Sequence, residues 1–238
     1  SMKQIHSNLM VSAVVFDCDG VLSDNGSSWQ NIHKHFGTDS GDDGAHAETL
    51  EMFLDGNISE EEFVEHDINL WKSVKAEIHR DEIMRCYSGV GLMEGARDVV
   101  EELQGRGVYV AIVSSGVDLF VGAIASMLKV DDWVANGFEW DDRGCLVRGL
   151  PTRVYSHKKG LMVEKLARIN GFEKSEIVSV GDSSTDLSMR IEGSSFIGFN
   201  PARPRSFEAF EEAGVPVVHG KDLRMIWPHL FPEEKGFS

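Results

Sequence analysis

Short apolar runs alternate with amphipathic stretches along most of this chain. The apolar runs are residues 13–16, 108–113, 177–180, 196–199 and 215–218. Such runs, bounded by turn residues, are typical of strands buried on both faces of a parallel sheet. Helices are predicted between them, at residues 96–103, 119–128, 159–171, 187–191 and 204–213, and residues 133–148 are predicted to form a hairpin. The pattern indicates an α/β fold with a doubly wound parallel sheet, whose ligands bind beyond the carboxyl ends of the strands.

This alternation is interrupted directly after the first strand. From residue 23 to about residue 88 the apolar spacing is helical, and helices are predicted at residues 27–36, 43–54, 59–71 and 80–87. Ser59 to Glu62 has the capping-box pattern that opens a helix. Because this block contains no strand, we expect a small helical cap of residues 23–88, inserted after the first strand of a core made of residues 1–22 and 89–238.

Negative charge is concentrated in the predicted cap. The chain has 238 residues and a net charge of −16, and residues 23–88 carry 15 Asp and Glu against 5 Lys and Arg, a net charge of −10. This charge argues against nucleic acid or an anionic membrane as a partner, and solubility is its simplest explanation. No apolar run approaches the roughly 20 residues needed to cross a bilayer.

The positions of the cysteines and histidines argue against a disulfide-stabilised protein and against a zinc protein. The three cysteines, Cys18, Cys86 and Cys145, are scattered, which argues against a disulfide framework and favours a reducing cytoplasm. His33 and His35 are two residues apart in a predicted helix and point away from each other, so zinc is not expected. The oligomeric state stays open.

Two carboxylates leave the first strand together. Side chains alternate along a strand, so Asp17 and Asp19 are expected to point the same way at its end. A bound cation would relieve their repulsion, which predicts a magnesium site with Asp17 as a nucleophile. Taken alone, the pair is also compatible with a solvated turn. An EF-hand loop is excluded because Val21, Leu22 and Ser28 occupy positions that need an oxygen ligand, a glycine and a glutamate.

Further polar groups follow the later strands. Ser114 to Gly116 follow the second core strand, Lys159 opens a helix, and Asp182 and Asp186 follow the next strand. A serine hydroxyl with the following N–H groups can hold an anion, and a lysine can bind a phosphate oxygen. Asp182 can complete a carboxylate metal site, supported by Asp186 through water or hydrogen bonds. Singly, Ser114 could be a helix N-cap and Lys159 a solvated lysine, but together they indicate phosphoryl transfer.

In four ordered motifs the chain resembles the haloacid dehalogenase superfamily. The motifs are residues 17–22, Ser114, Lys159 with Gly160, and Gly181 and Asp182 with Asp186. The resemblance covers about residues 13–200 and implies a Rossmann-like core, a Mg²⁺ cofactor and an aspartyl-phosphate intermediate. It also implies that Asp17 attacks phosphorus, while Asp19 protonates the leaving oxygen and later activates water. The implied metal ligands are Asp17, the backbone carbonyl of Asp19 and Asp182, and the implied phosphate-binding residues are Gly20, Ser114, Ser115 and Lys159.

Within the superfamily, residues 112–118 and 181–189 and the helical insert resemble phosphoserine phosphatases. Three positions depart from that branch. Gly26 stands where a cap glutamate reads the substrate amine, the arginine that pairs with the substrate carboxylate falls near Asp67, and Thr185 replaces an asparagine. The resemblance therefore implies that the catalytic groups are all present, while the cap residues that bind the amine and carboxylate of phosphoserine are absent.

Several residues are candidates for contact with the leaving group. They are Thr185, Asp67 and Trp29, with Phe63 and Trp71 as further aromatic candidates, although the three aromatic residues could instead pack the core of the cap.

The predicted function is hydrolysis of a small phosphorylated metabolite. Three alternatives stay open: a phosphoserine phosphatase, a phosphomutase or phosphotransferase that excludes water, and a metal-binding protein without turnover.

Overall fold

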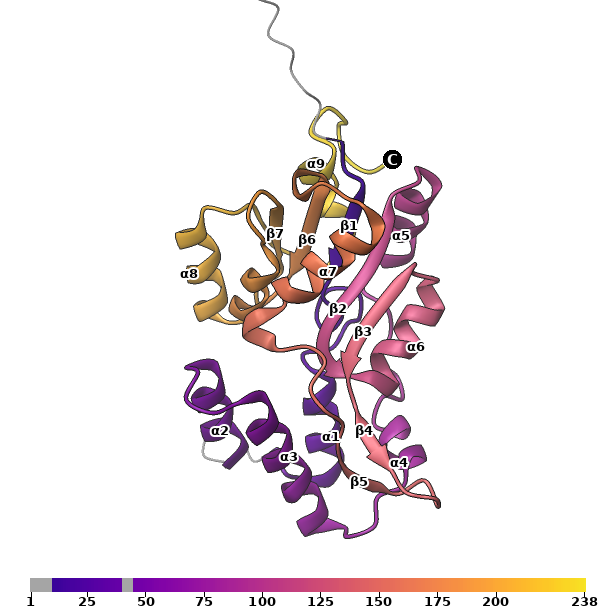
Figure 1. Ribbon diagram of the computed structural model, residues 1–238, viewed down its shortest axis with the longest axis vertical. Helices are drawn as coiled ribbons and strands as arrows, with labels where there is room; N and C mark the ends of the chain where they lie inside the picture. Colours follow the sequence, from indigo (N-terminus) through magenta and orange to yellow (C-terminus); the bar gives the residue numbers. More distant parts are fainter. Residues whose placement is uncertain (1–9, 40–44) are drawn as a thin grey trace, which may run out of the picture.

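The computed structural model describes residues 10–39 and 45–238, and its centre is a parallel sheet (Figure 1). Within the described residues this sheet has six strands, in the order β3-β2-β1-β6-β7-β8. Their bounds are β1 Ala13–Phe16, β2 Tyr109–Val117, β3 Asp132–Asn136, β6 Ile177–Gly181, β7 Ser195–Phe199 and β8 Val217–Val218. The strand order reverses at β1, which pairs in parallel with both β2 and β6. Ligands of doubly wound sheets bind at such a switch point, so the carboxyl end of β1 is the expected site.

Both faces of the sheet are covered, which explains why β1 is apolar at every position. Val14 and Phe16 pack into one buried cluster with α5 (Ala96–Gly105), α6 (Asp118–Leu128) and α9 (Trp227–Leu230). Ala13 and Val15 pack into a second cluster with α7 (Gly160–Asn170) and α8 (Pro204–Ala213). The structure confirms the predicted doubly wound α/β fold. Within residues 10–39 and 45–238, no helix is both long and apolar enough to cross a membrane.

The segment between β1 and β2 contains the predicted helical insert. Its helices are α1 (Ser28–Phe36), α2 (Ala45–Leu54), α3 (Glu60–Val74) and α4 (Arg80–Arg85), followed by α5, which returns to the sheet. The first four lie beyond the carboxyl edge of the sheet (Figure 1). The Ser27 side chain caps α1, and Ser59 and Glu62 form the predicted capping box of α3. The first two residues of the helix predicted at 43–54 lie outside the described residues.

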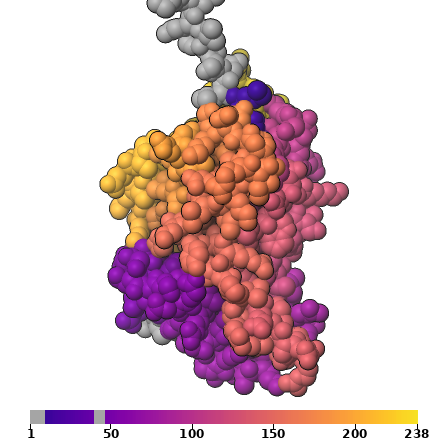
Figure 2. Space-filling model, in the orientation of Figure 1, coloured from indigo at the N-terminus to yellow at the C-terminus, as the bar shows by residue number. Residues whose placement is uncertain are grey.

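A small antiparallel hairpin lies beside this insert. Strands β4 (Phe138–Trp140) and β5 (Leu146–Gly149) pair with each other, and the Leu146 N–H donates to the Ile78 carbonyl at 2.7 Å. The hairpin therefore extends the helical insert, although it follows β3 in the sequence. In the space-filling view, the purple insert meets the orange and yellow residues of the core (Figure 2).

Some predicted elements differ from the structure. The hairpin predicted at 133–148 is wrong in its first half, because residues 132–136 pair in parallel with β2 and only residues 138–149 form a hairpin. A local alternating pattern does not reveal a strand's partner, and here the strand breaks at Gly137. The helix predicted at 187–191 is a short 3₁₀ turn at Ser184–Met189. Strand β2 continues to Val117, so Ser114 to Gly116 lie within it.

Candidate active site

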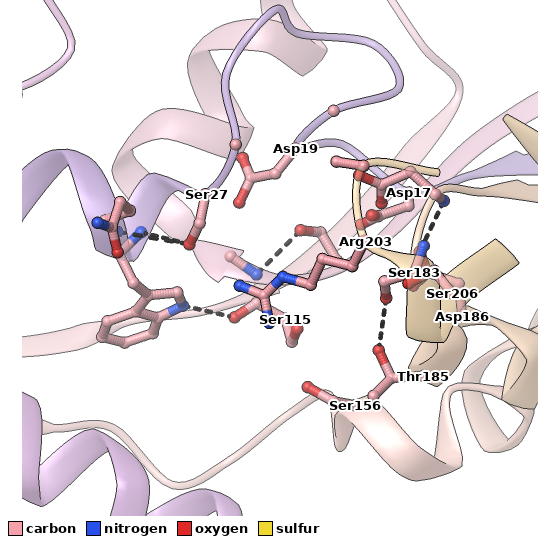
Figure 3. A pocket seen from close by; sticks show the side chains of 18 of the residues that line it. Asp17, Asp19, Ser27, Ser115, Ser156, Ser183, Thr185, Asp186, Arg203 and Ser206 are labelled. Atoms are coloured by element: carbon pink, nitrogen blue, oxygen red, sulfur yellow. Dashed lines mark hydrogen bonds between the residues drawn. The ribbon is translucent and has the colours of Figure 1, made fainter. Parts of the chain in front are cut away.

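Three carboxylates from two strand ends meet beside the switch point. Asp17 directly follows β1, Asp182 directly follows β6, and Asp186 lies in the 3₁₀ turn after it. One carboxylate oxygen from each lies within 4.8 Å of the others. Asp17 and Asp186 are buried, and Asp182 is half-buried. The structure thus brings together carboxylates that are more than 160 residues apart in the sequence, and Figure 3 shows Asp17 and Asp186 on one side of the pocket.

Lys159 supplies the positive charge beside these carboxylates. It precedes α7 and is 2% exposed. Its Nζ donates to Asp186 Oδ1 at 2.5 Å and to Asp17 Oδ1 at 3.3 Å. Burial would lower the pKa of Lys159, but the two carboxylates raise it above its ordinary value, so the amine stays charged.

Asp186 holds the second strand end in place. Its Oδ2 accepts from the N–H groups of Asp182 and Ser183 at 3.0 and 3.1 Å. Burial alone would raise the pKa of Asp186, but Lys159 and these hydrogen bonds hold it below its usual range. Asp186 therefore carries a charge that orients both Lys159 and the Asp182 loop, as expected of the residue predicted to support the metal ligands.

The charges of Asp17 and Asp182 are compensated less completely, although Lys159 also lowers the pKa of Asp17. Burial, followed by the charge of Asp186, raises the pKa of Asp17 to about 7, and burial and the charge of Asp17 raise the pKa of Asp182. One lysine does not balance three carboxylates. A divalent cation fits this oxygen-rich donor set, because Mg²⁺ prefers carboxylate oxygens and would stabilise both charges.

Gly20 allows the metal-binding loop to close tightly. Its φ is +77°, and a Cβ built there would lie 2.2 Å from Asp182 Oδ2. Only glycine combines this backbone conformation with so close an approach. A direct contact between Gly20 and phosphate stays a prediction.

Asp19 is held by the first turn of α1. Its Oδ2 accepts from the N–H and hydroxyl of Ser28 at 2.9 and 2.8 Å, and its Oδ1 accepts from Asn25 Nδ2 at 3.3 Å. Burial raises the pKa of Asp19, and the Ser28 hydrogen bonds oppose that rise. Its carboxylate does not belong to the three-carboxylate group, and its role in proton transfer stays a prediction. The contact of its backbone carbonyl with metal stays a prediction.

Ser114 and Ser115 line the same pocket from β2. The Ser114 hydroxyl is buried and accepts from the Gly116 N–H at 2.9 Å. The alternative that Ser114 caps a helix is wrong, because α6 begins at Asp118, after Val117, with no side-chain cap. A Cβ on Gly116 would lie 2.7 Å from Ser28 Oγ and 2.8 Å from Asp19 Oδ2, so β2 needs glycine to approach the acid.

A pocket of about 640 Å³ lies over these groups, between the helical insert and the core. Trp29 and Phe63 line it from the insert and Thr185 from the core. Trp29 also contributes to packing within the insert, because its ring stacks on that of Trp71 with the centroids 6.0 Å apart. Its Nε1 donates to the Ser115 carbonyl at 2.9 Å. Trp71 is fully buried. The pocket has the size of a small-molecule site.

Asp67 does not line this pocket. It is fully buried in the insert, where one carboxylate oxygen lies 3.0 Å from His33 Nε2. Gly26 does line the pocket, and a Cβ there would have no atom within 4 Å. The two positions implied to read phosphoserine in related enzymes are therefore occupied by a buried carboxylate in contact with His33 and by a glycine that leaves open space.

Sequence reasoning missed Ser28, Asn25 and Glu60. Each of them forms a hydrogen bond with a residue at least six positions away, Ser28 and Asn25 with Asp19 and Glu60 with Ser156. Nothing in the sequence around these three residues identifies their partners. Glu60, at the start of α3, accepts from the N–H and hydroxyl of Ser156 at 2.6 and 3.1 Å. The Ser156 carbonyl accepts from Ser188 Oγ, which in turn accepts from the Lys159 N–H at 2.9 Å. The insert is therefore linked by hydrogen bonds to the segment that carries Lys159.

Removal of Glu60 tests this link. In Glu60→Ala, the buried N–H and hydroxyl of Ser156 lose their acceptor, so we expect a loss of about 1–3 kcal/mol in unfolding free energy, measured by urea denaturation. Glu60→Gln keeps an acceptor oxygen and should lose less than half as much. Glu65→Ala makes the same change at an exposed site on the same helix and is the control. Equal urea midpoints for Glu60→Ala and Glu65→Ala would contradict the link.

The doubly wound sheet and the acidic triad beside a buried lysine define an α/β protein with a site suited to a metal ion and a phosphoryl group. A model of the haloacid dehalogenase-like hydrolases matches residues 14–190. The chain belongs to this family, as its four motifs predicted.

Its relatives refine this placement. The chain is 28% identical over 188 residues to a phosphoserine phosphatase of Archaeoglobus fulgidus, covering 79% of this chain and 52% of that protein. It therefore spans about half the length of that relative. It is 29% identical over 178 residues to a phosphoserine phosphatase of Methanocaldococcus jannaschii, covering 74% of this chain and 80% of that protein. These relatives confirm the predicted resemblance to the phosphoserine phosphatase branch.

Solved structures show the same fold. A substrate-bound phosphoserine phosphatase complex superposes with a TM-score of 0.74 at 24% identity, covering 92% of this chain and 98% of that one. A phospho-aspartyl intermediate analogue of phosphoserine phosphatase gives a TM-score of 0.74 at 25% identity, covering 93% and 99%.

Proposed function

We propose that this chain hydrolyses a small phosphomonoester through a phosphorylated Asp17, with Mg²⁺ as its metal ion. The observation that carries the proposal is the meeting of Asp17, Asp182, Asp186 and Lys159 at adjacent strand ends beneath one pocket. Asp19 lies beside them, held by Ser28. A nucleophile, an acid–base group and a fixed cation are the groups that phosphoryl transfer through a covalent intermediate needs.

In the first half-reaction, an oxygen of Asp17 attacks phosphorus and the bond from phosphorus to the leaving oxygen breaks. Asp19 donates its proton to that oxygen, so an alcohol departs. In the second half-reaction, Asp19 takes a proton from water, whose oxygen attacks the phosphorus on Asp17 and releases inorganic phosphate with Asp17 restored. The raised pKa of Asp19 suits it to both steps, because it can hold a proton in the first and accept one in the second.

Lys159 and the β2 serines orient the phosphoryl group in this proposal. The charge of Lys159 lies 3.3 Å from Asp17 Oδ1, where it can also reach an oxygen of the attacked phosphate. Ser114 and Ser115 line the opposite wall of the pocket and offer a hydroxyl and N–H donors. Asp17 and Asp182, with the backbone carbonyl of Asp19, would hold Mg²⁺, which would neutralise charge between the carboxylate and the phosphate dianion.

Phosphoserine is the second candidate substrate, because the relatives are phosphoserine phosphatases. The positions of Gly26 and Asp67 argue against it, since neither offers the group expected to read a serine amine or carboxylate. We therefore favour a different phosphorylated metabolite whose leaving group contacts Trp29, Phe63 and Thr185.

An assay with p-nitrophenyl phosphate and Mg²⁺ tests the proposal, and we expect release of inorganic phosphate without an added acceptor. A phosphomutase or phosphotransferase would release little phosphate under these conditions, and a metal-binding protein without turnover would release none. A panel of phosphorylated metabolites, compared by kcat/KM, then identifies the substrate. Phosphoserine turnover well above that of sugar and polyol phosphates would favour the second candidate.

A cytoplasmic location is proposed for this enzyme. The three cysteines are free, as expected in a reducing compartment.

A further inference from the structure

The cations that line the pocket differ in their partners. Lys159 is paired with two carboxylates, Arg205 lies 2.9 Å from Asp55, and Lys221 lies 3.6 Å from Asp24. Arg203 also lines the pocket, but no carboxylate in residues 10–39 and 45–238 lies within 4.0 Å of its guanidinium. Figure 3 shows this side chain extended into the pocket, toward the side where Ser115 and Ser27 lie.

The backbone around Arg203 is held from three sides. Pro204 follows it as the first residue of α8, which restricts the backbone. Ser206, one helical turn after Arg203, is buried. Its hydroxyl accepts at 3.1 Å from the N–H of Ser184, in the 3₁₀ turn that carries Asp186. Arg205 donates to Asp55 and to the Leu54 carbonyl at the end of α2. Arg203 is therefore carried on a backbone segment fixed both to the 3₁₀ turn Ser184–Met189 and to the insert, while its own side chain is exposed and free to meet a ligand.

A charged guanidinium without a partner in a substrate pocket is suited to an anionic ligand. The pocket wall is otherwise rich in carboxylates, and the insert above it has a net charge of −10. A substrate with a second negative charge would be repelled unless a cation faced that charge. Lys159 is already engaged beside Asp17, where the phosphoryl group is proposed to bind, so Arg203 is the cation left for the leaving group.

We propose that Arg203 binds a second negatively charged group, a carboxylate or a further phosphate, on the leaving group of the substrate. This inference rests on the proposed function, because it assumes that the phosphoryl group lies between Asp17 and Lys159. The guanidinium fork matches two oxygens of a carboxylate or phosphate. The insert of this chain lacks the implied cap arginine, and Arg203 places its charge in the same pocket from the core. The substrates are then phosphomonoesters with a second negative charge.

Matched substrate pairs test this assignment. 3-Phosphoglycerate differs from glycerol 3-phosphate by a carboxylate in place of a hydroxymethyl group, and fructose 1,6-bisphosphate differs from fructose 6-phosphate by a second phosphate. We expect the wild-type chain to prefer the charged member of at least one pair. In Arg203→Ala, the ratio of kcat/KM between charged and uncharged members should fall about 10- to 50-fold, mainly through KM. Which pair responds identifies the carboxylate or the second phosphate as the ligand.

Two further variants control this result. Arg203→Lys keeps the positive charge but lacks the paired N–H groups of the guanidinium, so it should restore part of the kcat/KM ratio between charged and uncharged substrates. Arg168→Ala removes an exposed arginine on α7 that does not line the pocket and should leave the ratio unchanged. The assignment would be overturned if the ratio of kcat/KM between charged and uncharged substrates were the same in Arg203→Ala as in the wild type. This holds even if the variant were slower on both substrates by the same factor.

A binding measurement separates this inference from the proposed function. Calorimetric titration of 3-phosphoglycerate and fructose 1,6-bisphosphate into Asp17→Asn chains with and without Arg203→Ala measures binding where turnover is prevented. We expect Kd for the preferred compound to rise about 10-fold in the variant. If no phosphate were released from any substrate but Kd rose in this way, the proposed hydrolysis would fail and the binding role would stand. An unchanged Kd together with active hydrolysis would overturn the binding role alone.

Discussion

Replacement of Asp17 by asparagine is expected to lower kcat for phosphomonoester hydrolysis by at least about 10³-fold. The amide is nearly the same size as the carboxylate, but it is a poor nucleophile, so the covalent step is lost. The side chain follows β1 directly and is buried among fixed partners, so no neighbouring carboxylate can take its place without a shift of the backbone. Phosphate release from p-nitrophenyl phosphate in excess Mg²⁺ measures the effect, and mass spectrometry should detect no phosphorylated intermediate in the variant.

The same substitution should leave the fold intact. Burial and the charge of Asp186 raise the pKa of Asp17, which means that its ionised form is disfavoured in the folded chain when no metal is bound. We therefore expect the Tm of Asp17→Asn without metal to equal or exceed that of the wild type, as is common when a strained catalytic group is removed. Asp142→Asn, at an exposed position in the β4–β5 turn, is the control for the loss of one charge. Activity of Asp17→Asn within tenfold of the wild type would exclude Asp17 as the nucleophile.

Features encoded in a few neighbouring residues could be predicted from the sequence. The apolar run of β1 has only one environment, a sheet covered on both faces, and the structure divides its four side chains between two clusters. Ser59 and Glu62 are three residues apart and form the capping box that their spacing indicates. Asp17 and Asp182 converge because parallel strands place their carboxyl ends at one edge, and Lys159 joins them because it opens α7, the helix that leads to β6.

Features that depend on a distant partner could not be predicted. The β3 strand and the β4–β5 hairpin share one alternating pattern, and only pairing with β2 separates them. The resemblance to phosphoserine phosphatases makes Asp67 a candidate for substrate contact, yet Asp67 is buried inside the insert beside His33, which lies on α1, two helices earlier in the chain. Arg203 stands in an ordinary loop sequence between two prolines, and only the folded chain places it in the pocket.

The helical insert holds the Asp19 carboxylate, the proposed acid, as well as covering it. Ser28 lies in the first turn of α1, and its hydroxyl donates to Asp19 while accepting from the Val117 N–H of β2 at 2.9 Å. One residue of the insert therefore fixes the acid relative to the strand that carries Ser114. A change in the position of the insert would therefore alter the orientation of the Asp19 carboxylate.

Removal of the divalent cation is expected to abolish turnover, and this effect should be reversible. Dialysis against EDTA should lower phosphate release by at least about 10³-fold, and Mg²⁺ should restore it, because the buried carboxylates and the phosphate dianion would otherwise repel each other. Binding is measured independently of activity by the Tm. Metal that binds the folded chain alone raises Tm, and at 100 times Kd the stabilisation is about 2.7 kcal/mol.

Asp182 distinguishes specific metal binding from a general salt effect. Asp182→Asn removes one of the three clustered carboxylates, so the variant should fold but show little increase in Tm with Mg²⁺. Asp142→Asn, in the distant hairpin turn, should respond to Mg²⁺ as the wild type does. Lys159 pairs with Asp17 and Asp186 but not, within 4.0 Å, with Asp182, so the loss of Asp182 leaves the lysine's ion pairs in place. If Asp182→Asn were stabilised by Mg²⁺ as strongly as the wild type, the ion would not bind at these strand ends, and the charge balance proposed for the transfer step would be wrong.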